Sequence, residues 1–487
     1  MNRAIKKAAI LSLLFMWFLS GWPQIWHNPP IPPKVEKVHA ITCGFGSDIG
    51  GNQCRGYITS GTTWNVPSDW NSSNNSIEAI GAGGNGANGV ANTSSGGGGG
   101  GGEYRESTAV SLTQSSTVDI NIPSGGDGSS ANGTWVKNGA GGGGTIVVEA
   151  KNGSNGSGTT AGSAGTGGTG AAANYNGGTG GVGRAATARP GGGGGGSAGP
   201  TGIGKDGGAG ANATGRGGGG GGGSNGGTSS AGASASSSTG GAGGNGTDGS
   251  GSGGGASSNQ SGSSGTSGGG GGGPGNTTGS NSTTGGSGGC DTAWDSSYGA
   301  CGGGGGGAGA SGTAGTGSRT GGGGGTYGGG GGGGGVSGAS GALTGGTGGQ
   351  GLIVITYSPI IISVTVTDGV VSYGTLPAGG SSDTTSSGLN DLQTATNDGT
   401  VTQNFNIKGQ NSGNWTLAAS AGSEQYVHQF STNAGSNWTA LTTSYQTLGT
   451  SIAASGTKTF DLKVTVPTST SSYTQQSIDV MVQAVQY

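Results

Sequence analysis

Cysteine spacing carries the clearest chemical meaning in this sequence. The four cysteines form two pairs, Cys43 with Cys54 and Cys290 with Cys301, and each pair has the spacing C-x10-C. Thiols that enclose such short loops favour local disulfides, each worth roughly 2–4 kcal/mol of stability. A zinc site fits poorly, because neither pair has the close spacing of a zinc knuckle. We therefore predict two local disulfides; the competing pairing would join residues 43–54 to residues 290–301.

The second of these loops, residues 290–301, holds the candidate binding residues. It contains Trp294, Tyr298 and Asp295, in a region that is nearly free of aromatic side chains. Aromatic rings beside a carboxylate can stack on a sugar and bind its hydroxyl groups, so we predict a ligand-binding role for these residues. The alternative is that Trp294 packs against the surrounding chain as a structural anchor. Weaker candidates of the same kind are Trp135 and Tyr175.

Catalytic patterns are weak throughout the chain. His428 is the single histidine beyond residue 40, and we expect a surface or packing role for it. Asp391 and Asp398 lie in a polar stretch whose spacing does not match a calcium-binding EF-hand loop. The GIGKDG stretch around Lys205 lacks the GK[ST] ending of a phosphate-binding loop. We predict that the protein is not an enzyme and has no catalytic residue, cofactor or metal site.

Residues 1–40 have the pattern of an export signal. Basic residues at Arg3, Lys6 and Lys7 precede an apolar stretch, residues 8–19, which is short for a spanning helix. We predict a secretory signal that ends near Ala40, with an uncleaved signal anchor as the alternative and the only expected membrane contact. Without these residues the formal charge falls from −3 to about −7, and no basic run remains. This argues against nucleic acid as a partner.

Glycine dominates the middle of the chain. The sequence has 131 glycines in 487 residues, against a norm of about 7%, and nearly all of them lie between residues 81 and 351. They include the uninterrupted runs 96–102, 191–196, 217–223, 268–273, 302–307, 321–325 and 328–335. One interpretation is a flexible Gly/Ser spacer. The other is a bundle of polyproline-II-type helices, in which backbones approach so closely that only glycine fits.

Strand-like stretches border the glycine region and favour the bundle. We predict strands at residues 107–112, 117–122, 145–150 and 352–357, because apolar and β-branched residues alternate or cluster there. A flexible spacer does not need strands that open and close it. We therefore expect a small β frame from which the glycine helices emerge and to which they return.

Specific motifs link this region to a known family. TWNVPSDW, IEAIGAGGNG, GGGGEY, TAWDSSYGACGGGGGG, TYGGGGGGGG and GGQGLIVITYSP occur in that order, over about residues 60–358. This region resembles the glycine-rich domain of phage tail-fibre adhesin tips and bacterial surface proteins. The resemblance implies a bundle of polyglycine II helices with binding loops at its far end. An export signal and a further C-terminal region depart from the phage pattern, so we carry over the fold and not the phage receptor.

Beyond residue 358 the composition changes to short alternating stretches separated by Gly, Asn, Ser and Thr. This pattern is typical of an all-β domain, and we predict an immunoglobulin-like β-sandwich that lacks the Cys…Trp…Cys hallmark. Expected core residues are Trp415, Phe430, Phe460 and Val480. The domain also resembles a C-terminal module of bacterial secreted proteins. The expected domains are therefore residues 1–40 (signal), 41–80 (leading segment with a disulfide loop and the first strand), 81–358 (glycine-rich) and 359–487 (sandwich).

These features predict a mainly β and irregular chain with no substantial α-helix beyond the signal segment. The expected function is that of an exported, non-catalytic surface-display protein with a rigid glycine-rich body, outside a bacterium or on its surface. One alternative is an adhesin that binds surface glycans or other cell-surface proteins through loops of the body. Another is a disordered spacer that carries the sandwich. Ice binding is a more distant alternative, because the sequence shows no regular Thr spacing.

Overall fold

The computed structural model describes residues 41–487 except 130–131, 186–188, 213–215, 237, 258, 277–281, 310–316, 337–342 and 368. The predicted export signal, residues 1–40, lies outside the described residues. The described part is all-β: it contains twenty strands and no helix, as the sequence predicts for its coarse fold class. Accordingly, no described helix has the length and apolarity that a membrane crossing requires.

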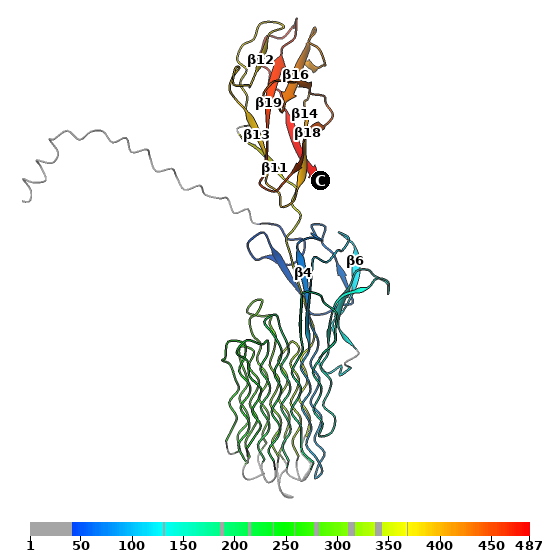
Figure 1. Ribbon diagram of the computed structural model, residues 1–487, viewed down its shortest axis with the longest axis vertical. Helices are drawn as coiled ribbons and strands as arrows, with labels where there is room; N and C mark the ends of the chain where they lie inside the picture. The colour runs from blue at the N-terminus through cyan, green and yellow to red at the C-terminus, as the bar shows by residue number, and fades with distance from the viewer. Residues whose placement is uncertain are drawn as a thin grey trace, which may run out of the picture. The chain divides into compact units, whose positions relative to one another are not determined.

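Strands from both ends of the glycine region meet in one antiparallel sheet (Figure 1). Its order is β1-β2-β10-β4-β5-β9. The bounds are β1 Ser47–Asp48, β2 Cys54–Ile58, β10 Leu352–Tyr357, β4 Asn75–Ile80, β5 Tyr104–Thr108 and β9 Ala173–Tyr175. Strand β10 confirms the prediction for residues 352–357, and it lies centrally because its side chains are buried on both faces. The strand predicted at 107–112 instead ends at Thr108, because Ala109 takes a left-handed φ of 50°.

A second antiparallel sheet packs against the first. Its order is β3-β6-β7-β8, with bounds β3 Thr63–Asn65, β6 Thr117–Asn121, β7 Gly133–Lys137 and β8 Ile146–Lys151. Strand β8 packs against β4 and β5 of the first sheet. Apolar side chains such as Ile77, Ile355, Val136 and Val148 are fully buried. The expected β frame at the border of the glycine region is therefore built on an ordinary side-chain core. We call the two sheets together the frame.

The glycine segments that leave the frame lie side by side and bond to one another through their backbones (Figure 1). We call these segments together the glycine bundle, or the bundle. In segment 96–102 every third N–H donates to the same neighbour. Gly96, Gly99 and Gly102 donate to segment 328–334, whereas Gly98 and Gly101 donate to segment 178–181, at N–O distances of 2.8–2.9 Å. The partner therefore changes with each residue and returns after three residues. The carbonyl groups of the same segment accept from three other segments, so it is bonded on every side.

Side-chain volume explains why the interior segments are pure glycine. A Cβ atom at Gly97, Gly98 or Gly99 would lie 2.1–2.2 Å from the carbonyl oxygen of a different neighbouring segment. No other residue fits at three consecutive positions that each face a backbone. The same holds along the runs 191–196, 217–223, 269–273, 302–307 and 329–335. These runs are interior segments, and their composition follows from their position.

Segments on the outside carry a side chain at every third position. Asn85 and Asn88 on one segment, and Thr344 and Thr347 on the next, follow this spacing. The run 321–325 also lies outside: the atoms nearest to a Cβ at Gly323 are 3.7 Å away, in ordinary contact. An all-glycine run therefore does not by itself identify an interior segment.

Short polar side chains complete the hydrogen bonding of the outer segments. Asn88 Oδ1 accepts from Gly345 N at 2.9 Å, and Ser261 Oγ accepts from Thr284 N at 3.1 Å. Backbone N–H groups at the edge of the bundle lack a carbonyl partner, and these side chains supply an acceptor. Backbone bonds also link Thr284 to Thr320 and Thr320 to Thr344 through their neighbouring glycines, so threonines far apart in sequence fall into one row. The regular Thr spacing that the sequence does not show exists across segments.

The C-terminal strands form two further arrays that share one apolar core. The larger has the order β11-β13-β19-β16-β15 with β12 and β17 beside it, and the smaller is β18-β14-β20. The bounds are β11 Val364–Thr367, β12 Ser381–Asp383, β13 Gln393–Asn397, β14 Gln403–Lys408, β15 Thr416–Leu417, β16 Gln425–Ser431, β17 Thr439–Ala440, β18 Gln446–Ile452, β19 Thr457–Thr465 and β20 Met481–Gln486. Phe430 and Phe460 are buried in this core as predicted, and so is Phe405. Trp415 and Val480 are only half-buried, because Trp415 donates its indole N–H to Thr470 at the domain surface and Val480 packs at the edge of the core.

Candidate functional site

Both predicted disulfides form, in the local pairing. Cys43 bonds to Cys54, the first residue of β2, and Cys290 bonds to Cys301. We call residues 43–54 the first cystine loop and residues 290–301 the second cystine loop. Cys301 is fully buried in the core of the frame and directly precedes the interior glycine run 302–307. Two disulfides are typical of proteins that fold in an oxidising compartment.

Asp291 shapes the base of the second cystine loop. Its Oδ1 accepts from the backbone N–H groups of Ala293 at 3.1 Å and Ala300 at 2.9 Å. Burial raises the pKa of this carboxyl, against the lowering effect of hydrogen bonds from Asn225 and these backbone groups. The loop is therefore closed twice, by the disulfide and by this carboxylate. Asp291 is committed to that role and faces no open surface.

Trp294 points from this loop onto the first sheet. Its Nε1 donates to Glu78 Oε2 at 3.0 Å and lies 3.2 Å from Oε1, and Tyr104 donates to the same carboxylate at 2.6 Å. Burial raises the pKa of Glu78 to about 7, and the charge of Glu106 on the neighbouring strand also raises it. The indole N–H therefore makes an internal contact with the frame. This is the arrangement expected if Trp294 is a structural anchor.

Tyr298 lies in a column of three tyrosines. Its ring stacks on Tyr57 of β2 with centroids 3.8 Å apart and planes 7° apart, and its centroid lies 5.8 Å from that of Tyr327. Burial raises the pKa of Tyr57 to about 12, assisted by the hydrogen bond and the charge of Asp295. The Tyr57 phenol therefore stays neutral at physiological pH. The column connects the second cystine loop to the strand that follows the first.

Arg55 and Asp295 form the polar part of this region. Arg55 donates through Nε to Thr356 Oγ1 at 3.1 Å and through Nη1 to the backbone oxygen of Trp294 at 3.4 Å. Asp295 Oδ1 accepts from Ser297 N at 2.7 Å and Tyr298 N at 2.9 Å. Slight burial opposes the ionisation of Asp295, but these backbone bonds, Tyr57 and Arg55 keep its pKa below the usual range. The carboxylate is therefore ionised near neutral pH.

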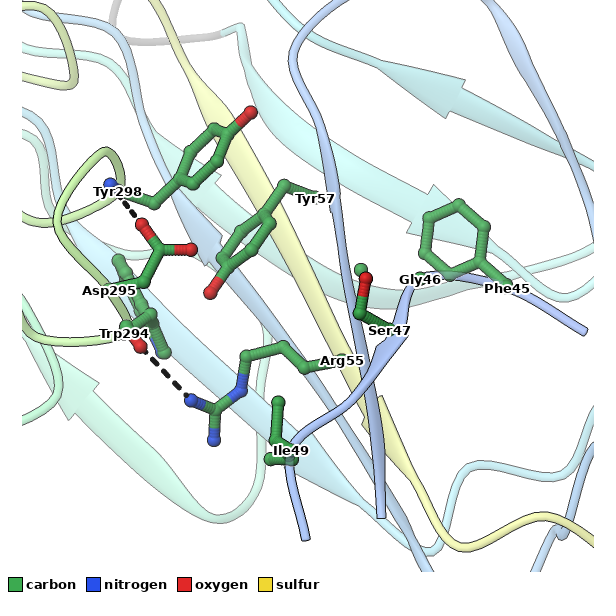
Figure 2. Close-up of a pocket in the computed structure, with 10 residues that line it drawn as sticks. Phe45, Gly46, Ser47, Ile49, Arg55, Tyr57, Trp294, Asp295 and Tyr298 are labelled. Atoms are coloured by element: carbon green, nitrogen blue, oxygen red, sulfur yellow. Dashed lines mark hydrogen bonds between the residues drawn. The ribbon is translucent and has the colours of Figure 1, made fainter. Parts of the chain in front are cut away.

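These residues surround a hollow of about 270 Å³ between the two cystine loops (Figure 2). Figure 2 shows Tyr57 between Tyr298 and Ser47, with Arg55 beside Ile49. The hollow is lined by Phe45, Gly46, Ser47, Ile49, Arg55, Gly56, Tyr57, Trp294, Asp295 and Tyr298. The three predicted binding residues thus lie at one site, together with residues 45–57 from the N-terminal part of the described chain. We call this hollow the inter-loop pocket.

Sequence reasoning missed Arg55 and Tyr57. Both follow Cys54 in the stretch CRGYI, and their separation by one residue places them on the same face of β2. That alternation was a readable signal. Their partners Trp294 and Tyr298 lie more than two hundred residues away, and no spacing in the sequence connects the two stretches.

Other sequence candidates lie outside this pocket. Tyr175 is near Tyr104 on the first sheet, with centroids 6.1 Å apart, and Trp135 on β7 lies under the ammonium group of Lys137. His428 is buried in β16, where Tyr373 lies 3.1 Å from its Nε2 and burial lowers its pKa to about 4. This is the packing role rather than the surface role. Within the described ranges, no group of three or more His, Cys, Asp or Glu residues is placed to hold a metal ion.

Comparison with protein-family models and with curated proteins finds no match to this chain. The functional argument therefore depends on the geometry of the glycine bundle and of the inter-loop pocket.

Proposed function

We propose that this chain is an exported, non-catalytic structural protein whose rigid glycine body displays loops outside a bacterial cell. The observation that carries the proposal is the hydrogen bonding of the glycine segments, in which the partner returns every third residue. A polyproline-II-type helix has three residues per turn and a rise of about 3.1 Å per residue, so this period supports polyglycine II helices. Eight residues of such a helix span about 25 Å.

The cross-linking of the helices supports the rigidity of the body. A single polyglycine II helix leaves its N–H and C=O groups unbonded, but each interior segment here donates to neighbours on three sides and accepts from others. The two disulfides and the export signal predicted for residues 1–40 support an extracellular or cell-surface location. The two C-terminal arrays that share one core support an immunoglobulin-like sandwich as the second domain. The resemblance to tail-fibre adhesin tips and bacterial surface proteins supports the same architecture.

Amide hydrogen exchange on the full chain tests this proposal against a disordered spacer. We expect strong protection of residues 330–335, because each of these N–H groups is buried and bonded to a neighbouring segment. The exposed stretch 473–475 provides the internal reference for unprotected amides. Exchange of 330–335 at random-coil rates would contradict the rigid body and favour the spacer.

A second candidate function is adhesion through the inter-loop pocket. The observation that favours it is the pairing of an aromatic wall, Tyr57 on Tyr298, with Arg55 and Asp295 in one hollow. Aromatic faces beside hydrogen-bonding groups are the usual means of binding sugars. A glycan array that compares the natural chain with Ser47→Trp tests this, because a large ring at Ser47 fills the hollow and leaves Arg55, Asp295 and the aromatic wall unchanged. Retained binding by the filled variant would contradict the pocket as the adhesive site.

A further inference from the structure

We propose that the inter-loop pocket takes one uncharged sugar ring, the terminal residue of a neutral glycan, and holds two adjacent hydroxyl groups between Arg55 and Asp295. This inference rests on the adhesion candidate above and names its ligand class. It excludes acidic and amine-bearing sugars as preferred ligands.

The first argument is the balance of charge in the pocket. Among the lining residues, Arg55 and Asp295 are the charged side chains, one of each sign. The carboxylate of Asp295 repels an anionic ligand, and the guanidinium of Arg55 repels a cationic ligand. An uncharged ligand avoids both repulsions. The two side chains interact with each other through space, so they share one small volume.

The second argument is the complementarity of donors and acceptors. A guanidinium group has five N–H donors, and Arg55 directs its Nε–H to Thr356 and one Nη1 hydrogen to Trp294. Arg55 also hydrogen-bonds to the Tyr57 hydroxyl, which leaves two of its five N–H groups for a ligand. Asp295 only accepts: backbone N–H groups engage its Oδ1, and the Tyr57 hydroxyl hydrogen-bonds to the same carboxylate, which has acceptor capacity left for one further donor. A hydroxyl group both accepts and donates, so a vicinal pair satisfies Arg55 and Asp295 at once, as neither an amine nor a carboxylate does.

The third argument is shape. Tyr298 covers one face of the Tyr57 ring, and Figure 2 shows the other side of that ring directed towards Ser47. Ile49 adds an apolar side chain that is 45% exposed. These groups suit the C–H face of a pyranose ring. The volume of about 270 Å³ lies below the usual lower bound of about 300 Å³ for a drug-sized ligand, so the pocket fits one ring and not a chain of rings.

The fourth argument is preorganisation. Each cystine loop is closed by its own disulfide, and Arg55 ties the strand after the first loop to the backbone of the second. The Asp295 turn and the Tyr57–Tyr298 stack fix the polar and aromatic walls before any ligand arrives. A site held in this way loses less conformational entropy on binding.

Ligand-observed NMR on the full chain tests the proposal with three matched sets of methyl pyranosides: neutral hexosides, a glucuronide and a glucosaminide. We expect saturation transfer to at least one neutral hexoside, and affinity for the two charged sugars at least tenfold weaker. Ser47→Trp should abolish the transfer. Asp295→Asn keeps the Oδ1 acceptor of the turn, and should weaken the neutral sugar about tenfold while reducing discrimination against the glucuronide. Tyr473→Ala, at an aromatic residue that is 90% exposed in the C-terminal region, is the matched control and should change nothing.

The outcomes separate the inference from the function on which it rests. Binding of the glucuronide or the glucosaminide as tight as that of every neutral hexoside, lost in Ser47→Trp, would overturn the neutral-sugar inference and leave adhesion standing. Absence of binding by all three sets, in protein with intact tryptophan fluorescence, would overturn both. Neutral-sugar binding that survives Ser47→Trp would overturn the pocket assignment.

Discussion

The glycine bundle and the C-terminal strands both depend on backbone hydrogen bonds, yet they select their neighbours by opposite means. In the C-terminal core, the side chains of Phe405, Phe430 and Phe460 fill the space between sheets. In the bundle, the absence of side chains brings backbones so close that a single added carbon would overlap a carbonyl oxygen. The first region is weakened when atoms are removed and the second when atoms are added.

The largest expected effect comes from removing atoms from the C-terminal core. Phe405→Ala should cost about 3–5 kcal/mol of that domain's stability, because the fully buried ring leaves a cavity. Hydrogen exchange by mass spectrometry should show faster exchange in residues 403–465 and unchanged exchange in residues 330–335. Equally faster exchange in both regions would contradict the view that side-chain packing stabilises only the C-terminal core.

Adding one methyl group to the interior of the bundle is the converse test. Gly98→Ala should cost about 3 kcal/mol, at the upper end of overpacking effects, since the new Cβ lies 2.1 Å from the oxygen of Gly193. Gly323→Ala is the matched control, because its Cβ meets no atom nearer than 3.7 Å. We expect the control to change stability by less than about 0.5 kcal/mol. Thermal unfolding measures both, and similar losses in the two variants would refute the interior and exterior assignment.

Opening the second disulfide tests how the frame fixes the start of a glycine segment. Cys290→Ser with Cys301→Ser should cost about 2–3 kcal/mol and speed exchange in residues 302–307, because a segment without side chains has little else to set its register. The corresponding change in the first cystine loop should leave that run protected. Protection of 302–307 in both double variants would show that hydrogen bonds alone hold the register.

A rise in pH should lower the stability of the frame and leave that of the bundle unchanged. The folded-state pKa of Glu78 is raised to about 7, so its contribution to stability is fully present below its unfolded pKa and is lost as the pH rises through 7. Between pH 5 and pH 8 we expect a loss of about 2 kcal/mol from this group. Tryptophan fluorescence reports it, because Trp294 bonds to Glu78. Glu78→Gln should flatten the profile, and an unchanged profile in that variant would assign the dependence elsewhere.

Local patterns predicted a definite part of this molecule. The strand at 352–357 follows from its apolar run, the two cystines follow from equal short spacings, and the core positions of Phe430 and Phe460 follow from alternation. Each of these depends on residues within about ten positions along the chain. The sequence pattern placed the end of this strand at residue 112, but β5 ends at Thr108. Ala109 takes a left-handed backbone conformation there, which the composition of the stretch does not reveal.

The sequence by itself determined which segments are pure glycine and which have a side chain at every third residue, and its spacing favoured the local pairing of the cysteines. Only the tertiary structure decided which segment neighbours which, because glycine segments have no side chains that could distinguish one partner from another. It likewise decided that run 321–325 lies outside, and that Arg55 and Tyr57 meet Trp294 and Tyr298 at one pocket. Those contacts join stretches that only the closed frame brings together, and their geometry depends on the packing of the whole body rather than on any local preference.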